Sequence, residues 1–259
     1  MAAAGSSDST DDLTLSATDA DGRVDADAAI VLGDAPPSAR VALDRRRIVE
    51  TALEHIEDTG LASLTMRRLG TRLGVEAMSL YNYVPGKEEL LDAVVEALID
   101  DMRADPDVIA TPETGWQDFL QRLAHGVRRV ALAHPKSFPL VASRPPEAPW
   151  LRPPLRSLDW VETFLSGLCD SGFSDEAAVA AYRAFTSFLL GNLLLEVSTM
   201  GADIGPLDVL EDGSDTGSLR GHPTVARLRS SLGEDHAAAE FEESLEELLN
   251  RIAIIRVEL

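Results

Sequence analysis

Six side chains between residues 67 and 87 are of types that form hydrogen bonds with nucleic acids: Arg67, Ser79, Tyr81, Asn82, Tyr83 and Lys87. Asparagine, serine and arginine can read the edges of base pairs, whereas tyrosine and lysine commonly bind phosphate oxygens. We therefore expect base contacts from Asn82, Ser79 and Arg67, and phosphate contacts from Tyr81 and Lys87.

Two short helices are predicted to hold these side chains. Thr65 is a good N-cap residue, and Gly74 can adopt the left-handed conformation that ends a helix. Leu80 and Val84, four residues apart, then predict a second helix of about two turns. The buried face of the first helix is predicted from apolar residues spaced three and four apart, namely Met66, Leu69 and Leu73. The pattern is typical of a helix-turn-helix.

The second helix suits the major groove of DNA, because its remaining residues are small, polar or aromatic and none is acidic. We add Ala77 and Met78 to the expected DNA contacts, since Met78 can pack on a thymine methyl group. A Pro-Gly break then leads into a long amphipathic helix from Lys87 to about Ala104. Free backbone N–H groups at a helix N-terminus attract phosphate, which favours Lys87 as a phosphate contact.

This order of motifs resembles the DNA-binding domain of the TetR family of transcriptional regulators. The resemblance rests on Gly74-Val75, five residues, Tyr81, and then Pro85-Gly86-Lys87 before an acidic, leucine-rich helix. It extends over roughly residues 44 to 250 and is greatest to the tetracycline-repressor branch. Further similar segments are Trp116 to Leu120, Arg144-Pro145, Cys169 to Phe173, Leu190-Gly191 and Phe241 to Leu249.

The resemblance implies an all-α fold, with an N-terminal three-helix helix-turn-helix DNA-binding domain and a larger helical ligand-binding and dimerisation domain. It also implies a repressor that binds a palindromic operator on double-stranded DNA as a homodimer and is released by a small-molecule effector. The dimer is expected to form through the helices Asp175 to Ser198, with Asp175 as N-cap, and Ala237 to Ile255. The first of these is apolar nearly all round and must be covered on several sides.

Charge and composition divide the chain into three expected parts: a disordered acidic arm at residues 1–40, the DNA-binding domain at 41–90, and the effector-binding and dimerisation domain at 91–259. The formal net charge of -21 is unfavourable for binding a polyanion. However, residues 1–39 hold eight aspartates and one arginine, whereas residues 40–87 hold eight basic and six acidic residues. The net basic segment is the one that carries the motif.

The overall composition predicts a soluble, cytoplasmic protein with no membrane partner. With 259 residues, of which 45% are hydrophobic, the chain can bury a substantial core. No run reaches the roughly 18 apolar residues of a membrane helix, and the polar start lacks the regions of a signal peptide. The single cysteine, Cys169, lies in an apolar helical stretch and is expected to be a buried structural thiol.

An effector pocket is predicted among the central helices. Its candidate lining is aromatic and aliphatic with few polar groups, which is typical of pockets for drug-like or lipid-like ligands. The candidates are Trp116, Phe119, Leu123, Val127, Trp160, Phe164, Phe188 and Asn192. The alternative for each of them is simple packing in the core.

The identity of the effector does not carry over from the tetracycline-repressor branch. There, magnesium-tetracycline is held partly by a histidine just before the Arg-Pro pair and by a glutamate in the long helix. In this sequence the first position falls on Leu140 or Val141, and the second falls on Leu195 or Glu196. An asparagine of the drug site corresponds to Leu123. We therefore expect a largely apolar effector that binds without a metal.

Two other classes of function compete with a DNA-binding regulator. An enzyme is disfavoured because the five histidines show no metal-ligand spacing, no serine or cysteine lies in a nucleophile turn, and no glycine-rich loop follows a strand. No catalytic residue, metal site or cofactor is predicted. A helical protein-interaction module that has lost DNA binding is the second alternative, and the overall acidity favours it. The pattern does not distinguish a repressor from an activator.

Overall fold

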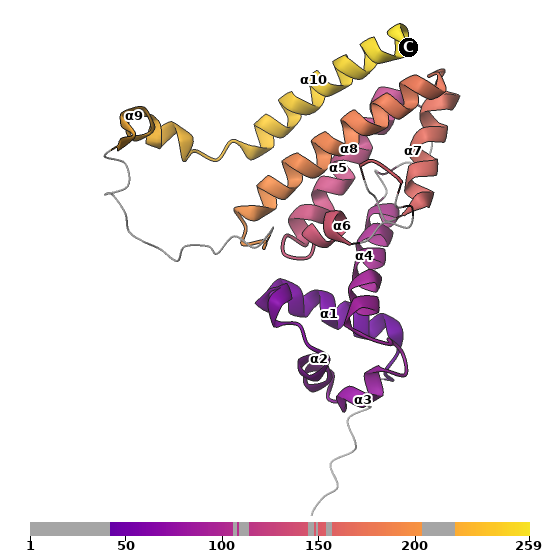
Figure 1. Cartoon of the computed structure of the whole chain (residues 1–259), viewed down its shortest axis with the longest axis vertical. Coiled ribbons are helices and arrows are strands. Elements are labelled where there is room, and N and C mark those ends of the chain that lie inside the picture. The colour runs from indigo at the N-terminus through magenta and orange to yellow at the C-terminus, as the bar shows by residue number, and fades with distance from the viewer. Residues whose placement is uncertain are drawn as a thin grey trace, which may run out of the picture. The chain divides into compact units, whose positions relative to one another are not determined.

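The computed structural model describes residues 42–105, 108, 114–144, 148, 150–153, 157–203 and 221–259. Every regular element in these residues is a helix, which confirms the predicted all-α fold (Figure 1). Residues Leu43–Leu259 form one compact unit. The predicted acidic arm at residues 1–40 lies outside the described residues.

Four short elements form the N-terminal head, a name we use for α1 (Arg45–Thr59), η1 (Leu61–Ser63), α2 (Met66–Leu73) and α3 (Ala77–Leu80). Asp44 caps α1 by accepting a hydrogen bond from the backbone N–H of Arg47 at 2.8 Å. Thr65 caps α2 in the same way, accepting from the N–H of Arg68 at 3.2 Å. Gly74 has a φ of 71° and ends α2, so both predicted signals for this helix are confirmed.

Helix α4 (Lys87–Ala104) begins and ends at the predicted residues. It packs on α1 at one end and on α5 and α6 further along (Figure 1). Its buried side chains include the whole predicted apolar stripe, namely Leu90, Leu91, Val94, Val95, Leu98, Ile99 and Met102, and Ala93 is buried as well. Because these side chains are shared between the head and the central helices, α4 belongs to both cores.

The central helices are α5 (Trp116–Ala133), α6 (Pro139–Ser143), α7 (Leu158–Asp170) and α8 (Asp175–Ser198). The five-residue α6 was not predicted, since it is too short to show a helical period. Helix α7 begins at Leu158 because Ser157 caps it, accepting from the N–H of Trp160 at 3.4 Å. The prediction that Asp175 caps α8 is wrong by one residue: the Ser174 side chain accepts from the N–H of Ala177 at 3.1 Å.

Helix α8 packs against α5, α7 and α10, as its apolar character requires. Its length and composition alone would allow it to cross a membrane. A core helix of a soluble protein has the same two properties, and α8 buries side chains from Ala177 to Val197. We therefore attribute its composition to packing on three neighbouring helices.

The chain ends in two further helices, α9 (Pro223–Leu232) and α10 (Ala237–Glu258). Helix α10 packs on α8 and α5 and buries Phe241, Leu245, Ile252 and Ile255. Helix α9 buries no residue. Helix α10 begins at the predicted Ala237 and extends three residues beyond the predicted end at Ile255.

Cys169 is exposed on α7, so the expectation of a buried thiol is wrong. The buried residues of this helix are Val161, Phe164, Gly167 and Leu168. Cys169 follows Leu168 by one residue, which turns it about 100° around the helix axis. This rotation directs the thiol away from the buried face.

Candidate functional site

The turn between α2 and α3 brings backbone atoms unusually close together at Gly70. A Cβ atom at this position would lie 2.9 Å from the carbonyl oxygen of Val75 and 3.2 Å from Cα and N of Ala77. The N–H of Val75 donates a hydrogen bond to the carbonyl oxygen of Gly70 at 2.9 Å. Leu80 and Val84 are almost completely buried beneath α3. Together these contacts hold α3 in a defined position on α2.

Helix α3 is shorter than the two turns that were predicted. Regular helix covers Ala77–Leu80 only. Tyr81 keeps helical dihedral angles, with φ of -66° and ψ of -16°, and the N–H of Val84 donates to the carbonyl oxygen of Leu80 at 2.9 Å. The chain therefore continues for one more helical turn in looser geometry, which carries Tyr81, Asn82 and Tyr83.

None of the eight expected DNA contacts is buried. Arg67, Tyr81, Asn82 and Tyr83 are exposed, and Met78 is 74% exposed, which is unusual for a large apolar side chain. The remaining three are half-buried: Ala77, Ser79 and Lys87. A protruding apolar side chain among polar and aromatic ones can pack against a thymine methyl group in a major groove.

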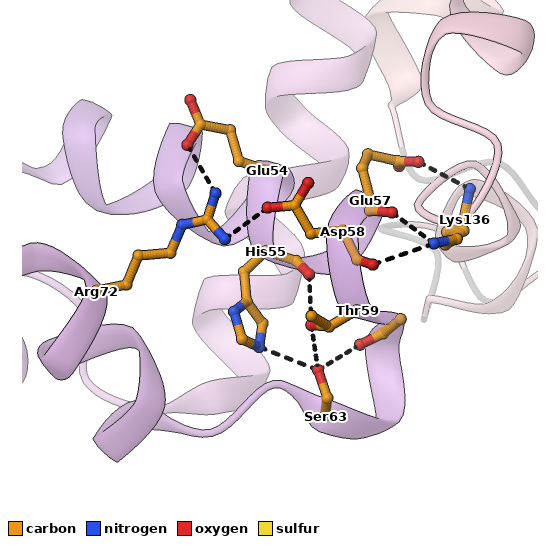
Figure 2. Close-up of polar contacts among 9 residues, drawn as sticks. Glu54, His55, Glu57, Asp58, Thr59, Ser63, Arg72 and Lys136 are labelled. Carbon is orange, nitrogen blue, oxygen red and sulfur yellow. Dashed lines mark hydrogen bonds and ion pairs between the residues drawn. The ribbon is translucent and has the colours of Figure 1, made fainter. Parts of the chain in front are cut away.

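Several basic residues of the head are bound by acidic neighbours. The Arg72 guanidinium contacts Asp58 at 2.7 Å and Glu54 at 3.3 Å (Figure 2), and the hydrogen bond to Asp58 raises the pKa of Arg72. Arg45 pairs with Glu96 at 3.2 Å. In contrast, the side chains of Arg67 and Lys87 make no hydrogen bond or ion pair within the described residues. These two cations are therefore the ones that remain available to phosphate or base.

A clamp formed by Glu57 and Lys136 connects the end of α1 to the turn between α5 and α6 (Figure 2). The Glu57 carboxylate accepts from the backbone N–H groups of Lys136 at 3.2 Å and Ser137 at 2.9 Å. The Lys136 ammonium in turn donates to the backbone carbonyl oxygens of Glu57 at 2.6 Å and Asp58 at 3.4 Å. The partners are 78 to 80 residues apart. No local pattern could have revealed the clamp.

A second connection joins the end of α6 to the first turns of α4. Arg144, whose side chain is only 12% exposed, contacts Glu88 at 2.7 Å and Asp92 at 2.6 Å. These charge-assisted bonds fix the guanidinium against α4. The similarity at Arg144-Pro145 was the only sequence signal for this residue.

A cavity of about 80 Å³, which we call the central cavity, lies among α4, α5, α6, α7 and α8. Its walls are mainly aliphatic and aromatic. They consist of Ile99, Met102, Leu123, Val127, Val141, Ser157, Trp160, Phe164, Tyr182, Phe185, Thr186, Leu189 and Leu190. None of these lining residues carries a charge.

Four of the eight predicted pocket residues line this cavity, namely Leu123, Val127, Trp160 and Phe164. The other four lie elsewhere. Trp116 packs edge-on against Phe173, with ring centroids 5.3 Å apart. Phe119 is tilted against Phe164, Phe188 packs on Phe241, and Asn192 is half-buried on α8. Sequence spacing identified buried faces, but it could not show which buried face borders empty space.

The hydroxyl groups of Tyr182 and Thr186 both line the cavity and lie close together on α8. The Tyr182 hydroxyl donates to the carbonyl oxygen of Pro153 at 2.9 Å. Burial raises the pKa of Tyr182 to about 12, although a hydrogen bond from Thr186 opposes the shift. Tyr182 is therefore a neutral hydrogen-bond donor at physiological pH.

A half-buried ion pair joins α5 to the C-terminal part of α8. The Arg128 guanidinium donates two hydrogen bonds to the Glu196 carboxylate at 2.5 and 3.1 Å and stacks over the Phe241 ring, 5.1 Å from its centroid. The side chain of Arg128 is 20% exposed and that of Glu196 is 9% exposed. Glu196 is one of the two residues that could correspond to the glutamate of the family's drug site, and its carboxylate is already bound by Arg128. No group of three or more potential metal ligands occurs within the described residues.

Comparison with known proteins matches both halves of the chain. Residues 48–94 match bacterial regulatory proteins of the tetR family, and residues 110–254 match the tetracyclin repressor-like C-terminal domain. The protein belongs to the TetR family. The first TetR match covers most of α1, all of α2 and α3, and the start of α4. The second covers α5 to α9 and most of α10. The predicted resemblance is confirmed.

Individual TetR relatives agree with the family assignment. The tetracycline repressor protein class C of Escherichia coli is 32% identical over 192 residues, which cover 73% of this chain and 80% of the relative. A possible TetR family transcriptional regulator from Streptomyces coelicolor A3(2) has a similar structure, with a TM-score of 0.63 and 31% identity over 82% of this chain and all of that one. The TetR protein from Acinetobacter baumannii AYE gives a TM-score of 0.61 at 26% identity, over 83% of this chain and 99% of that one.

As a TetR-family member the protein is a DNA-binding transcriptional regulator of the effector-responsive kind, which confirms the predicted class of function. The family is one of regulators and not of enzymes. The TetR helix-turn-helix corresponds to α2 and α3, the segment with exposed Met78, Tyr81, Asn82 and Tyr83.

Proposed function

We propose that the protein is a repressor whose dimer binds a palindromic operator and dissociates from it when a small-molecule effector occupies the central cavity. The observation that carries this proposal is the course of α4. This helix contributes Ile99 and Met102 to the cavity wall, and its first residue, Lys87, follows the turn after α3. A ligand that moves α4 would therefore move the helix-turn-helix, provided that it binds the two positions with different affinity.

The operator contacts are proposed at the eight residues between Arg67 and Lys87 that were expected to bind DNA. Asn82, Ser79 and Arg67 would read base edges, and Tyr81 and Lys87 would bind phosphate. The lack of an acidic partner for Arg67 and Lys87 among the described residues supports this division. The proposed DNA-binding domain spans residues 41–90 and the effector-binding and dimerisation domain spans residues 91–259. A regulator with this task would act in the cytoplasm.

The effector is proposed to be largely apolar and to bind without a metal. The uncharged lining of the cavity and its residues Leu123 and Val141 support this, as does the pairing of Glu196 with Arg128. Several relatives are named for tetracycline, but we expect magnesium-tetracycline not to raise the melting temperature of this protein. A screen of aromatic and lipophilic compounds should instead find one that raises it and lowers operator affinity.

The homodimer is proposed to form through the outer faces of α8 and α10. Apolar side chains that the protomer leaves exposed on these helices include Leu195 at 67%, Ile254 at 47% and Val257 at 86%. A Cβ at Gly191 would meet no atom of the protomer, so a second helix could approach closely there. Two-fold symmetry with one helix-turn-helix per protomer fits a palindromic site.

A mobility-shift assay with DNA from the gene's own neighbourhood tests the proposal. Lys87→Ala should weaken binding to all sequences alike and lower the slope of log affinity against log salt by about one unit, whereas Asn82→Ala should change sequence preference. Arg229→Ala, which removes one positive charge from exposed α9, serves as the charge-matched control and should leave the slope unchanged. No shift with any neighbouring DNA would favour the protein-interaction module instead.

A further inference from the structure

The central cavity contains a polar group that has no hydrogen-bond partner among the described residues. Within the described residues, three buried side-chain atoms have no hydrogen-bond partner: Nδ1 of His134, Oγ of Ser137 and Nε1 of Trp160. Of these three residues only Trp160 lines the cavity. A buried donor without a partner is rare, and it often marks a position that a ligand or water completes.

The other polar groups of the cavity already have partners. The Tyr182 hydroxyl donates to Pro153, and Thr186 hydrogen-bonds to Tyr182. The Ser157 hydroxyl accepts from the backbone N–H of Trp160 at 3.4 Å and from Arg103 at 3.5 Å. Among the described residues the Trp160 indole N–H is therefore the polar group of the cavity that lacks any hydrogen-bond partner, and an indole nitrogen cannot act as an acceptor.

Charge further restricts what the cavity can bind. A carboxylate or ammonium group would leave water for a site with no lining charge of opposite sign, which is strongly unfavourable. A pure hydrocarbon would fit the walls but would leave Nε1 of Trp160 unsatisfied. A neutral molecule with an acceptor oxygen satisfies both conditions.

We infer that the effector is an uncharged aromatic molecule with a carbonyl or ether oxygen, and that this oxygen accepts a hydrogen bond from the Trp160 indole N–H. The inference rests on the proposed function, because it assigns the ligand class of the same cavity. At about 80 Å³ the cavity is smaller than the roughly 300 Å³ of ordinary ligand sites. A single ring is therefore the appropriate probe, and larger effectors require the half-buried Val127, Trp160 and Leu190 to move.

The test uses three single-ring probes that differ in one property: acetophenone has a neutral acceptor, ethylbenzene has none, and benzoate is charged. Full-length protein labelled with ¹⁵N-tryptophan should give three indole N–H signals, since the chain has three tryptophans. The signal that Trp160→Phe removes identifies Trp160. An unchanged chemical shift of the buried Trp116 indole N–H shows that the variant is folded.

Acetophenone should move the Trp160 proton signal downfield with saturation, ethylbenzene should bind without a downfield shift, and benzoate should leave the signal unchanged. Trp160→Phe should weaken acetophenone binding about fivefold and ethylbenzene binding less than about twofold, as expected for the loss of one neutral hydrogen bond. Trp150→Phe makes the same change at a side chain that is 76% exposed and should alter neither affinity.

The inference is overturned if acetophenone and ethylbenzene lose affinity equally in Trp160→Phe, if benzoate binds as tightly as acetophenone, or if no probe affects the Trp160 signal. Operator affinity, measured separately by fluorescence anisotropy, tests the proposed function. Binding of acetophenone at Trp160 with unchanged operator affinity at saturation would support the ligand site but count against its role in release.

Discussion

Replacement of Gly70 by alanine should displace α3 and reduce operator binding. The new Cβ would lie 2.9 Å from the Val75 carbonyl oxygen and 3.2 Å from two backbone atoms of Ala77. Ordinary contacts begin near 3.4 Å, so the turn must shift by roughly half an ångström, and none of the three atoms can rotate away because all belong to the backbone. The close approach is therefore relieved only by moving α3.

Two opposing effects decide the magnitude for Gly70→Ala. Alanine is favoured over glycine inside a helix by about 1 kcal/mol, whereas overpacking costs about 1 to 3 kcal/mol. We expect a net loss of about 1 kcal/mol in the free energy of unfolding. The effect on specific binding should be larger, at least about tenfold, because each misplaced base contact costs about 1 to 3 kcal/mol.

Urea unfolding followed by circular dichroism measures the stability of Gly70→Ala, and fluorescence anisotropy with operator and random DNA measures its affinity. Affinity for random DNA should change little, since it depends on charge. Thr71→Ala is the matched control for stability, because it improves helix propensity at the next residue without adding atoms. If Gly70→Ala were as stable as the wild type and bound the operator equally well, the close approach would not constrain α3.

Three other changes test separate features. Glu57→Gln should lower the free energy of unfolding by about 1 to 3 kcal/mol, because it weakens the charge-assisted bonds to two backbone N–H groups. Glu50→Gln, at an exposed ion pair with Arg46, should change the free energy of unfolding by less than about 0.5 kcal/mol. Urea unfolding measures both. Burial raises the pKa of Tyr182 to about 12, so between about pH 10 and 12 this tyrosine ionises only in the unfolded chain. The contribution of Tyr182 to the free energy of unfolding should therefore be fully present below about pH 10 and be lost as the pH rises toward 12. Tyr182→Phe should lessen this alkaline loss in thermal melts; an identical pH profile would contradict it. Leu195→Glu should yield folded monomers in sedimentation velocity, and an intact dimer would exclude this face of α8 from the interface.

Leu195 is a better position for testing the dimer interface than the residues that the spacing of apolar side chains on α8 and α10 would suggest. Leu189 and Leu245 belong to the apolar patterns of α8 and α10, but they are 6% and 1% exposed within a single protomer. A glutamate at either position would disrupt the protomer core before it could report on dimerisation. A hydrophobic pattern marks burial and does not reveal whether the covering side chains come from the same chain.

Features with local causes could be predicted from the sequence. Thr65 and Gly74 act on their own helix, so the cap and the stop of α2 were read correctly. The role of Gly70 depends on backbone atoms five and seven residues further along, and only the presence of glycine inside a helix hinted at it. The clamp between Glu57 and Lys136 depends on the complete fold and left no pattern.

Nine of the thirteen residues that line the central cavity escaped prediction for a similar reason. Ile99 and Met102 were assigned only to the stripe of α4, and Tyr182 and Phe185 only to an apolar helix. Which of many buried side chains border empty space depends on how five helices meet, because the gap between them is small compared with the core. The unsatisfied nitrogen of Trp160 likewise became visible only with its surroundings in place.

The two connections at Glu57 and Arg144 have a consequence for how a dimer would search for its operator. A head attached through one flexible turn would sample many orientations. Once the head of one protomer had bound its half-site, the partner's head would therefore have a low effective concentration at the second half-site. Attachment through α1 as well as α4 removes most of those orientations. The effective concentration then rises steeply at one half-site spacing and falls at all others. The tolerance of the operator for inserted base pairs should therefore depend on residues that never touch DNA.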